Sequence, residues 1–273
     1  MGLSVSSIKA GLQTWKKGWL SFVLVVIILS FAFVPLILIS YIFLQNSPDI
    51  IGLLLFILLS FTLLIFYSLL QGIVQAIGNE VSEMGTGRAE NITYYIKRNG
   101  KALIVAGIII SGLSLILSTP LLVIDNLSNS NMILGQPNQT IWIVTSITRL
   151  VITIIVNSIF SLAISAIIFN NLDATPALTR SFELFKKHYK SILFVVVIFE
   201  SILWAIFSLL RLTVYKPNIQ LFEVVFIIII SIMILFIVFP LMNLTYFHLY
   251  LKLTLPSVPI PETKDKDVPI KII

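Results

Sequence analysis

Two oppositely charged side chains lie inside long apolar stretches of this chain, where ionised groups are costly. Glu200 is near the middle of the apolar run 192–211, and Arg149 is inside the run 141–169. If these runs cross a membrane, each charge costs on the order of 3 kcal/mol on insertion scales, so it needs a partner or marks a path for protons or substrate. We expect either a structural ion pair between two helices or a relay site built on both residues.

The run 141–169 also carries a polar residue at every fourth position. Four residues turn a helix by 400°, so this line drifts by about 40° per step and wraps part of the helix. It predicts either a seam for helix packing or the lining of a solvated pathway. The small residues of the line recur in the run 51–77, but Arg149 and Asn157 have no counterpart there. The line consists of Thr145, Arg149, Thr153, Asn157, Ser161 and Ser165.

A second polar line lies at the end of the run 51–77 and includes Gln71 and Gln75. These amides are candidates to line an inner vestibule, although a helix leaving a membrane gives the same pattern. The candidate functional residues are therefore Arg149, Asn157 and Glu200. The candidate lining residues are Thr145, Thr153, Ser161, Ser165, Gln71 and Gln75.

Sequence motifs of catalysis and cofactor binding are missing. The chain has no HExxH, no Walker A motif and no glycine-rich fingerprint after a strand. Asp125 and Asp173 fall in predicted loops, and His188 and His248 have no companion metal ligands nearby in the sequence. We therefore expect no enzymatic activity and no catalytic, cofactor-binding or metal-binding residue.

The composition indicates a membrane protein. Of the 273 residues, 58% are hydrophobic and only 11% are charged, against about 25% charged in soluble domains. A spanning helix needs roughly 20 mostly apolar residues. Continuous apolar runs favour helices over barrel strands, which alternate apolar and polar residues. We predict an all-α fold, a single polytopic membrane domain over residues 1–273, with six spans at 19–43, 51–77, 102–122, 141–169, 192–211 and 221–251.

Three basic pairs, Lys16-Lys17, Lys97-Arg98 and Lys186-Lys187, each precede two of these runs. Large apolar residues at helical spacing lie before and directly after the first and third pairs, which predicts an amphipathic helix in the membrane interface. We call such a helix an elbow. These residues are Ile8, Leu12, Trp15 and Trp19 in the first elbow, and Leu178, Phe182, Phe185 and Tyr189 in the third. The elbows anchor the chain to membrane lipids, or alternatively bind anionic lipid or nucleic acid.

The chain thus reads as three elbow–hairpin repeats, at about 4–77, 88–169 and 176–251, with a tail at 252–273. Most of its 18 Lys and Arg residues lie before the first span, between spans two and three, between spans four and five, or after span six. Loops rich in Lys and Arg stay in the cytoplasm. We therefore expect a multi-pass protein of the cytoplasmic membrane with both termini and all three elbows inside.

The segment 177–190, with Ala177-Leu178, Ser181-Phe182 and Lys186 before a hairpin, resembles the membrane domain found beside glycerophosphodiesterases. Size, topology and the cysteine-free composition are similar to those of the polytopic membrane subunit of the crenarchaeal DNA-import (Ced) system. That resemblance implies a channel or scaffold subunit of a translocation system, with DNA as cargo, other membrane subunits and a separate cytoplasmic ATPase as partners, and a possible homo-oligomer. The alternatives are an accessory membrane protein for lipids or small solutes, and a secondary transporter.

Overall fold

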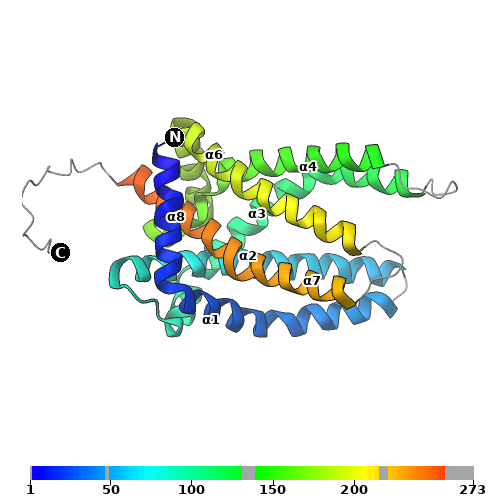
Figure 1. Ribbon diagram of the computed structural model, residues 1–273, viewed down its shortest axis with the longest axis horizontal. Coiled ribbons are helices and arrows are strands. Elements are labelled where there is room, and N and C mark those ends of the chain that lie inside the picture. The colour runs from blue at the N-terminus through cyan, green and yellow to red at the C-terminus, as the bar shows by residue number, and fades with distance from the viewer. Residues whose placement is uncertain (1, 47–48, 131–138, 215–220, 256–273) are drawn as a thin grey trace, which may run out of the picture.

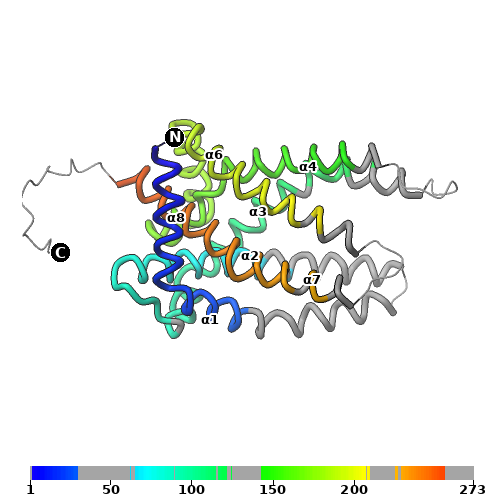
Figure 2. Tube along the Cα trace, in the orientation of Figure 1, coloured from blue at the N-terminus to red at the C-terminus, as the bar shows by residue number. Residues whose placement is uncertain are grey.

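The computed structural model describes residues 2–46, 49–130, 139–214 and 221–255 (Figure 2). Parts of the predicted outer loops, at 47–48, 131–138 and 215–220, and the tail from 256 to 273 lie outside the described residues. In the outer half of the first hairpin, at residues 30–46, 49–61 and 63–64, and near the other outer loops, the description is limited to the backbone.

The described chain is helical throughout, which confirms the predicted all-α class. Its elements are α1 (Gly2–Asn46), α2 (Asp49–Met84), the 3-10 turn η1 (Ala89–Asn91), α3 (Ile92–Ser130), α4 (Gln139–Phe160), α5 (Ala163–Asn170), α6 (Ala174–Val214), α7 (Leu221–Met233), the π-helical segment η3 (Ile234–Val238) and α8 (Phe239–Thr254).

Five stretches of the described chain are long and apolar enough to cross a membrane. They are Gly2–Leu29, Ile92–Leu121, Ile143–Asn170, Ala174–Ile206 and Ile229–Thr254. Large hydrophobic side chains such as Ile116 and Val144 stay exposed along them, as expected of helices surrounded by lipid rather than water. The protein is therefore a multi-pass membrane protein.

Two of the long helices bend directly after a basic pair. Helix α1 leaves helical geometry at Gly18, and α6 does so at His188. In Figure 1 the first part of α1, drawn dark blue, runs across one end of the bundle, whereas the rest of α1 runs along it. The part before Gly18 is thus a separate elbow, and the bend divides the candidate span Gly2–Leu29. The middle elbow is shorter, because α3 begins only at Ile92 after the turn η1.

The helices pack as a ring of three hairpins. Helix α1 packs on α2, α3 on α4, and α6 on α7. Neighbouring hairpins meet through the pairs α2–α3, α4–α6 and α8–α1, and the last pair closes the ring. The returning helices α2, α5 and α8 also contact one another in the middle. We call these three the return helices. The first residue of α1, Gly2, and the last residue of α8, Thr254, lie at the same end of the molecule (Figure 1).

The end that carries the elbows, here called the inner end, contains the hydrophobic core of the described residues. Leu70, Ile73 and Ile77 of α2 are at most 1% exposed. Leu162, in the turn before α5, and Leu244 of α8 are buried to the same degree. Side chains therefore fill the inner half of the ring.

Two helices extend beyond the spans predicted from hydropathy. Helix α2 continues past residue 77 to Met84, and α3 continues past residue 122 to Ser130. The prediction that residues 123–130 form a loop was wrong. The residues from Asp125 to Ser130 are mostly polar, and a polar helix is stable outside the hydrocarbon layer, where hydropathy no longer marks its end.

Candidate functional site

A cluster of hydrogen-bonded side chains joins the three return helices at the centre of the ring. Ser165 of α5 donates from Oγ to Gln75 Oε1 at 2.8 Å, and Gln75 Nε2 of α2 donates to Asn243 Oδ1 of α8 at 3.5 Å. Asn243 Nδ2 donates to the Phe239 carbonyl at 2.9 Å. All three side chains are at most 1% exposed. We call Gln75, Ser165 and Asn243 the amide cluster.

Glu200 has an amide rather than a cation as its described partner. Asn157 Nδ2 donates to Glu200 Oε1 at 2.6 Å, joining α4 to α6. Glu200 is 9% exposed. Among the described residues, no ion pair joins Glu200 to Arg149, the partner expected from the sequence. A short amide-to-carboxylate bond stabilises a buried carboxyl group without placing a second charge in the membrane.

Two tyrosines from the return helices complete the surroundings of Glu200. Tyr67 on α2 and Tyr246 on α8 are within electrostatic range of Glu200, although no hydrogen bond joins either to it among the described residues. The Tyr246 ring meets Phe199 edge to face, with centroids 6.3 Å apart, and its buried hydroxyl has no hydrogen-bond partner among the described residues. We call Glu200, Asn157, Tyr67 and Tyr246 the carboxylate cluster.

The predicted polar line of residues 145–165 faces the bundle. Thr145 and Ser165 are buried, and Arg149, Thr153, Asn157 and Ser161 are partly buried. The exposed positions described on α4 are hydrophobic except Thr148, whose hydroxyl donates to the Val144 carbonyl of the same helix. The line does not run on one straight helix, because the chain breaks between α4 and α5 at residues 161–162. It therefore serves two clusters, with Asn157 in the carboxylate cluster and Ser165 in the amide cluster.

Each of two helix breaks receives a hydrogen bond from an elbow. Ser181 Oγ of the α6 elbow donates to the Ile159 carbonyl at 2.7 Å, beside the α4–α5 break. Pro240 has no N–H for the Phe236 carbonyl four residues earlier, and Trp15 Nε1 of the α1 elbow donates to that carbonyl at 3.3 Å. Carbonyls left free within a membrane need such donors. The elbows thus stabilise the irregular points of the neighbouring hairpins.

The two long elbows use small residues to pack on the bundle. The buried face of the first elbow is Ser4, Ser7, Gly11 and Thr14. Gly11 lies so close to α8 that an added Cβ would be 2.8 Å from Thr245 Oγ1, and Thr14 Oγ1 is 2.7 Å from His248 Nε2. The apolar face predicted from the sequence is divided: Leu12 and Trp19 are 38% and 54% exposed, whereas Ile8 and Trp15 pack against the core at its edge.

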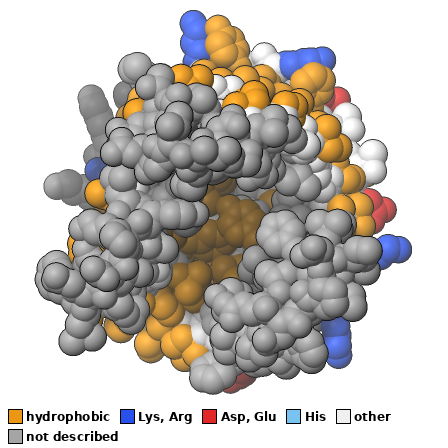
Figure 3. Space-filling model, turned by 90° about the vertical axis from the view of Figure 1, so that its right-hand side faces the viewer, with side chains coloured by type: hydrophobic (Ala, Val, Ile, Leu, Met, Phe, Trp, Pro, Cys, Tyr) orange, Lys and Arg blue, Asp and Glu red, His pale blue; other side chains and the backbone are white. Residues whose placement is uncertain are grey.

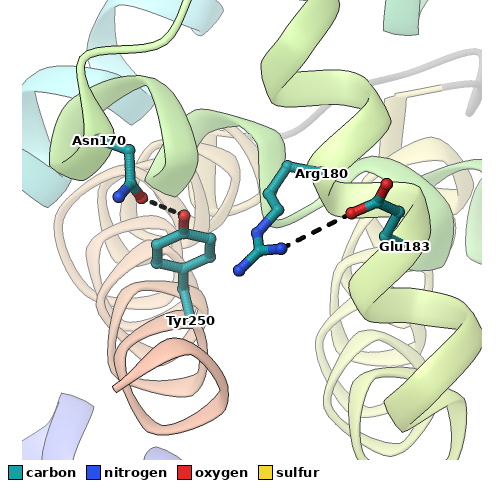
Figure 4. Close-up of polar contacts among 4 residues, drawn as sticks. All are labelled: Asn170, Arg180, Glu183 and Tyr250. Atoms are coloured by element: carbon teal, nitrogen blue, oxygen red, sulfur yellow. Dashed lines mark hydrogen bonds and ion pairs between the residues drawn. The ribbon is translucent and has the colours of Figure 1, made fainter. Parts of the chain in front are cut away.

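Polar contacts at the inner end join the return helices α8 and α5, next to an ion pair within the third elbow. The Tyr250 hydroxyl donates to Asn170 Oδ1 at the end of α5, and Arg180 pairs with Glu183 at 3.6 Å. Figure 4 shows the Arg180 guanidinium between the Tyr250–Asn170 pair and Glu183. The ion pair is about half exposed, so it adds little stability, but it orients Arg180 at this end.

The opposite end of the molecule is hollowed. Figure 3 looks at that end and shows a depression in the middle of the ring, with hydrophobic side chains on its floor. The hollow faces the packed inner half, which contains the amide cluster.

No family model, curated protein or solved structure matches this chain. The resemblances drawn from the sequence therefore stay predictions.

Sequence reasoning missed Asn243 and Tyr246. Asn243 lies three residues after Pro240 in an apolar run, where burying an amide is as costly as it is at Asn157. A single amide in such a run could have marked Asn243 as a candidate residue. Tyr246 gave no such signal, because tyrosines near the end of a span are typical of the membrane interface. Gln71 is partly buried on α2, one helical turn from Tyr67.

Proposed function

We propose that this protein is a non-enzymatic, membrane-embedded subunit of a translocation system, in which the ring of three hairpins encloses a path closed at its inner half. The amide cluster carries the proposal. One buried polar side chain from each return helix meets the others at the centre of the ring, and polar residues inside a membrane bundle typically mark substrate or ion pathways.

Packing alone is a weaker explanation of the amide cluster. Hydrogen bonds between transmembrane helices contribute on average only about 0.6 kcal/mol, and apolar side chains of similar size fill a core without any desolvation cost. The hollow at the opposite end supports the proposal further, because a path through the ring would start there and meet the amide cluster in the closed half.

The finer topology belongs to this proposal. Six spans in three elbow–hairpin repeats place both termini and all elbows on the cytoplasmic side of the cytoplasmic membrane. The bends at Gly18 and His188 support the repeats, because each follows a basic pair. The common end of Gly2 and Thr254 supports an even number of spans.

DNA import is the most specific form of the proposal. Since side chains fill the inner half of one chain, DNA would have to pass between copies of this chain or between it and other membrane subunits. A separate cytoplasmic ATPase would then supply the energy.

A small cargo is the second candidate, because a specific observation favours it. Glu200 is the one described carboxylate that is buried within the spans, away from the loop ends. Its hydrogen-bond partner is an amide, and two tyrosines are within electrostatic range of it. This arrangement suits a small cationic or protonated solute and repels a polyanion.

The test is a variant in which the amide cluster becomes apolar: Gln75→Leu, Ser165→Ala and Asn243→Leu together. A strain that lacks the chain is complemented with the wild type or with the triple variant at equal membrane abundance. We expect the triple variant to insert and fold but to lose uptake. The assays measure transfer of a DNA marker and uptake of labelled small solutes, which separates the two candidates.

The control is Gln13→Leu, which replaces an exposed amide on the first elbow and should leave uptake unchanged. If the triple variant restores every lost uptake activity, the amide cluster serves packing only and the proposal is wrong.

A further inference from the structure

The surroundings of Glu200 contain more hydrogen-bonding capacity than they use. A carboxylate offers about four acceptor positions on its two oxygens, and the described partner, Asn157, occupies one of them on Oε1. Asn157 donates through Nδ2, so its Oδ1 stays available as an acceptor. Glu200 is only 9% exposed, so bulk water does not solvate it freely.

The second observation is the Tyr246 hydroxyl. Tyr246 is 4% exposed, its hydroxyl oxygen is buried, and no hydrogen-bond partner for it lies within the described part of the chain. That hydroxyl lies within electrostatic range of Glu200. Buried polar groups are almost always paired, and an unpaired one calls for a specific explanation such as an ion or water. A buried carboxylate with unused acceptor positions, together with an unpaired hydroxyl within electrostatic range, fits a positively charged ligand.

We propose that the carboxylate cluster binds a small monovalent cation, either Na⁺ or a proton. A sodium ion would take its oxygen ligands from Glu200, Asn157 Oδ1 and the Tyr246 hydroxyl. A proton would sit on Glu200 and be donated to the Tyr246 oxygen. In both cases one positive charge neutralises the buried carboxylate, which removes most of its cost in the membrane.

The aromatic contacts of Tyr246 and Tyr67 favour the same class of ligand. Tyr246 packs on Phe199, and Tyr67 meets Phe239 with ring centroids 5.3 Å apart. Ring faces attract cations, and aromatic packing limits access by larger polar solutes. The titratable groups that interact electrostatically with Glu200 are Tyr67 on α2 and Tyr246 on α8. Arg149 is the one titratable residue of α4, and α2 and α8 also carry Glu80, Glu83, His248, Tyr250 and Lys252 nearer the inner end.

This inference rests on the proposed translocation function, to which it adds an ion. The carboxylate cluster draws Tyr67 and Tyr246 from two return helices and Asn157 and Glu200 from α4 and α6. A bound cation would therefore bridge all three hairpins, and its release would loosen the contacts that close the ring. An ion that binds only one arrangement of the helices shifts the ring toward that arrangement.

The experiment uses the full-length protein in lipid nanodiscs and measures the midpoint of thermal unfolding. Sodium chloride replaces N-methyl-D-glucamine chloride at constant ionic strength. A ligand that binds only the folded protein raises the midpoint with its concentration. If Na⁺ is the ligand, we expect the midpoint of the wild type to rise with Na⁺ and that of Glu200→Gln to stay constant.

A pH series without sodium tests the proton. If Glu200 holds a proton in the folded protein, the folded state binds it more tightly than the unfolded state, so stability falls as pH rises. Glu200→Gln mimics the protonated side chain and should lack this dependence. Glu83→Gln, at an exposed position of α2, is the matched control and should behave as the wild type in both series.

Tyr246→Phe separates a ligand from an orphan hydroxyl. If the Tyr246 hydroxyl is a sodium ligand, its removal should weaken Na⁺ binding. The Na⁺ concentration that gives half of the rise in the unfolding midpoint should then increase by roughly ten-fold or more. As part of the proton site, its loss should weaken the pH dependence. If Glu200→Gln does not fold, Glu200→Asp keeps the charge and shortens its reach, which should weaken the response to the cation.

The proposal is overturned if the wild type and Glu200→Gln respond equally to Na⁺ and equally to pH. These outcomes are separate from those of the uptake assay. If the wild type shows no cation response but the apolar triple variant still loses uptake, the cation site is rejected and the translocation function is not. Cation binding together with full uptake by the apolar triple variant would reject the translocation function and leave the site in place.

Discussion

At the scale of single residues, Asn157 and Glu200 show how the bundle accommodates a carboxyl group. Asn157 comes from α4 and Glu200 from α6, and the bond of 2.6 Å between them is among the shortest side-chain contacts between spans. A neutral partner leaves the carboxyl free to exchange a cation, whereas an arginine partner would hold it ionised permanently. The choice of partner therefore bears directly on function.

A double-mutant cycle measures this contact. We expect Asn157→Ala and Glu200→Ala each to destabilise the protein, and the double variant to lose about 1.5–3 kcal/mol less than the sum, the usual range for a hydrogen bond to a charged group. The measurement is the free energy of unfolding in mixed micelles. The cycle of Asn157→Ala with the exposed Glu183→Ala is the control and should be additive. Additive losses in the first cycle would show that the contact is not formed in solution.

The sequence located this contact only in part. An intramembrane Glu200 and a polar line containing Asn157 are visible in the sequence, because ionised or amide groups stand out in apolar runs. Spacing along a straight helix favoured Arg149 as the partner. The relative height and rotation of two packed helices depend on bends such as His188, and the residues at a bend give no quantitative signal of the direction in which the helix continues.

At the scale of elements, close packing between helices depends on particular small residues. Gly107 of α3 faces Ser68 of α2 so closely that an added Cβ would be 1.6 Å from Ser68 Oγ. Gly112, five positions further along the same helix, has nothing within 4 Å of that position. The two glycines therefore provide a matched pair, one at an interface between hairpins and one at an open surface.

We expect Gly107→Ala to lower the midpoint of thermal unfolding and Gly112→Ala to leave it unchanged or raise it. A helical alanine is favoured over glycine by about 1 kcal/mol, and at Gly107 the displacement of α2 from α3 outweighs that gain, because overpacking costs typically about 1–3 kcal/mol. The measurement is thermal unfolding in detergent, with insertion checked by membrane fractionation. An equal response of both variants would show that α2 and α3 are further apart than described.

The elbows show what the sequence pattern could and could not predict at this scale. The basic pairs and the apolar residues at helical spacing predicted helices before spans one and five, and the bends at Gly18 and His188 end them where expected. The pattern did not reveal the opposite face, with Gly11 and Ser181, which packs on the bundle. Small residues carry little hydropathy, so a pattern based on apolar residues misses a seam that depends on close approach.

At the scale of the whole molecule, the ring has two unlike ends. The inner end has the elbows, the cations of the basic pairs and a filled core, and the opposite end is hollow. Lys186 lies over the Phe182 ring at 4.2 Å, so the outer face of the third elbow combines a cation with an exposed aromatic side chain. That combination is typical of helices at the headgroup level of a membrane, and it places the inner end at one membrane surface.

The orientation of the ring across the membrane follows from this asymmetry and is directly testable, since the chain has no cysteine. We expect a single cysteine at Asn138, in the predicted outer loop, to react with an impermeant thiol reagent in intact cells. A cysteine at Thr86, between α2 and η1, should react only after the membrane is opened. Thr86 is exposed and is a better probe than its neighbour Gly85, whose φ of +79° disfavours any side chain. Labelling of Thr86→Cys but not Asn138→Cys in intact cells would place the elbows outside. The hollow would then open toward the cytoplasm, and the proposed direction of translocation would have to be reversed.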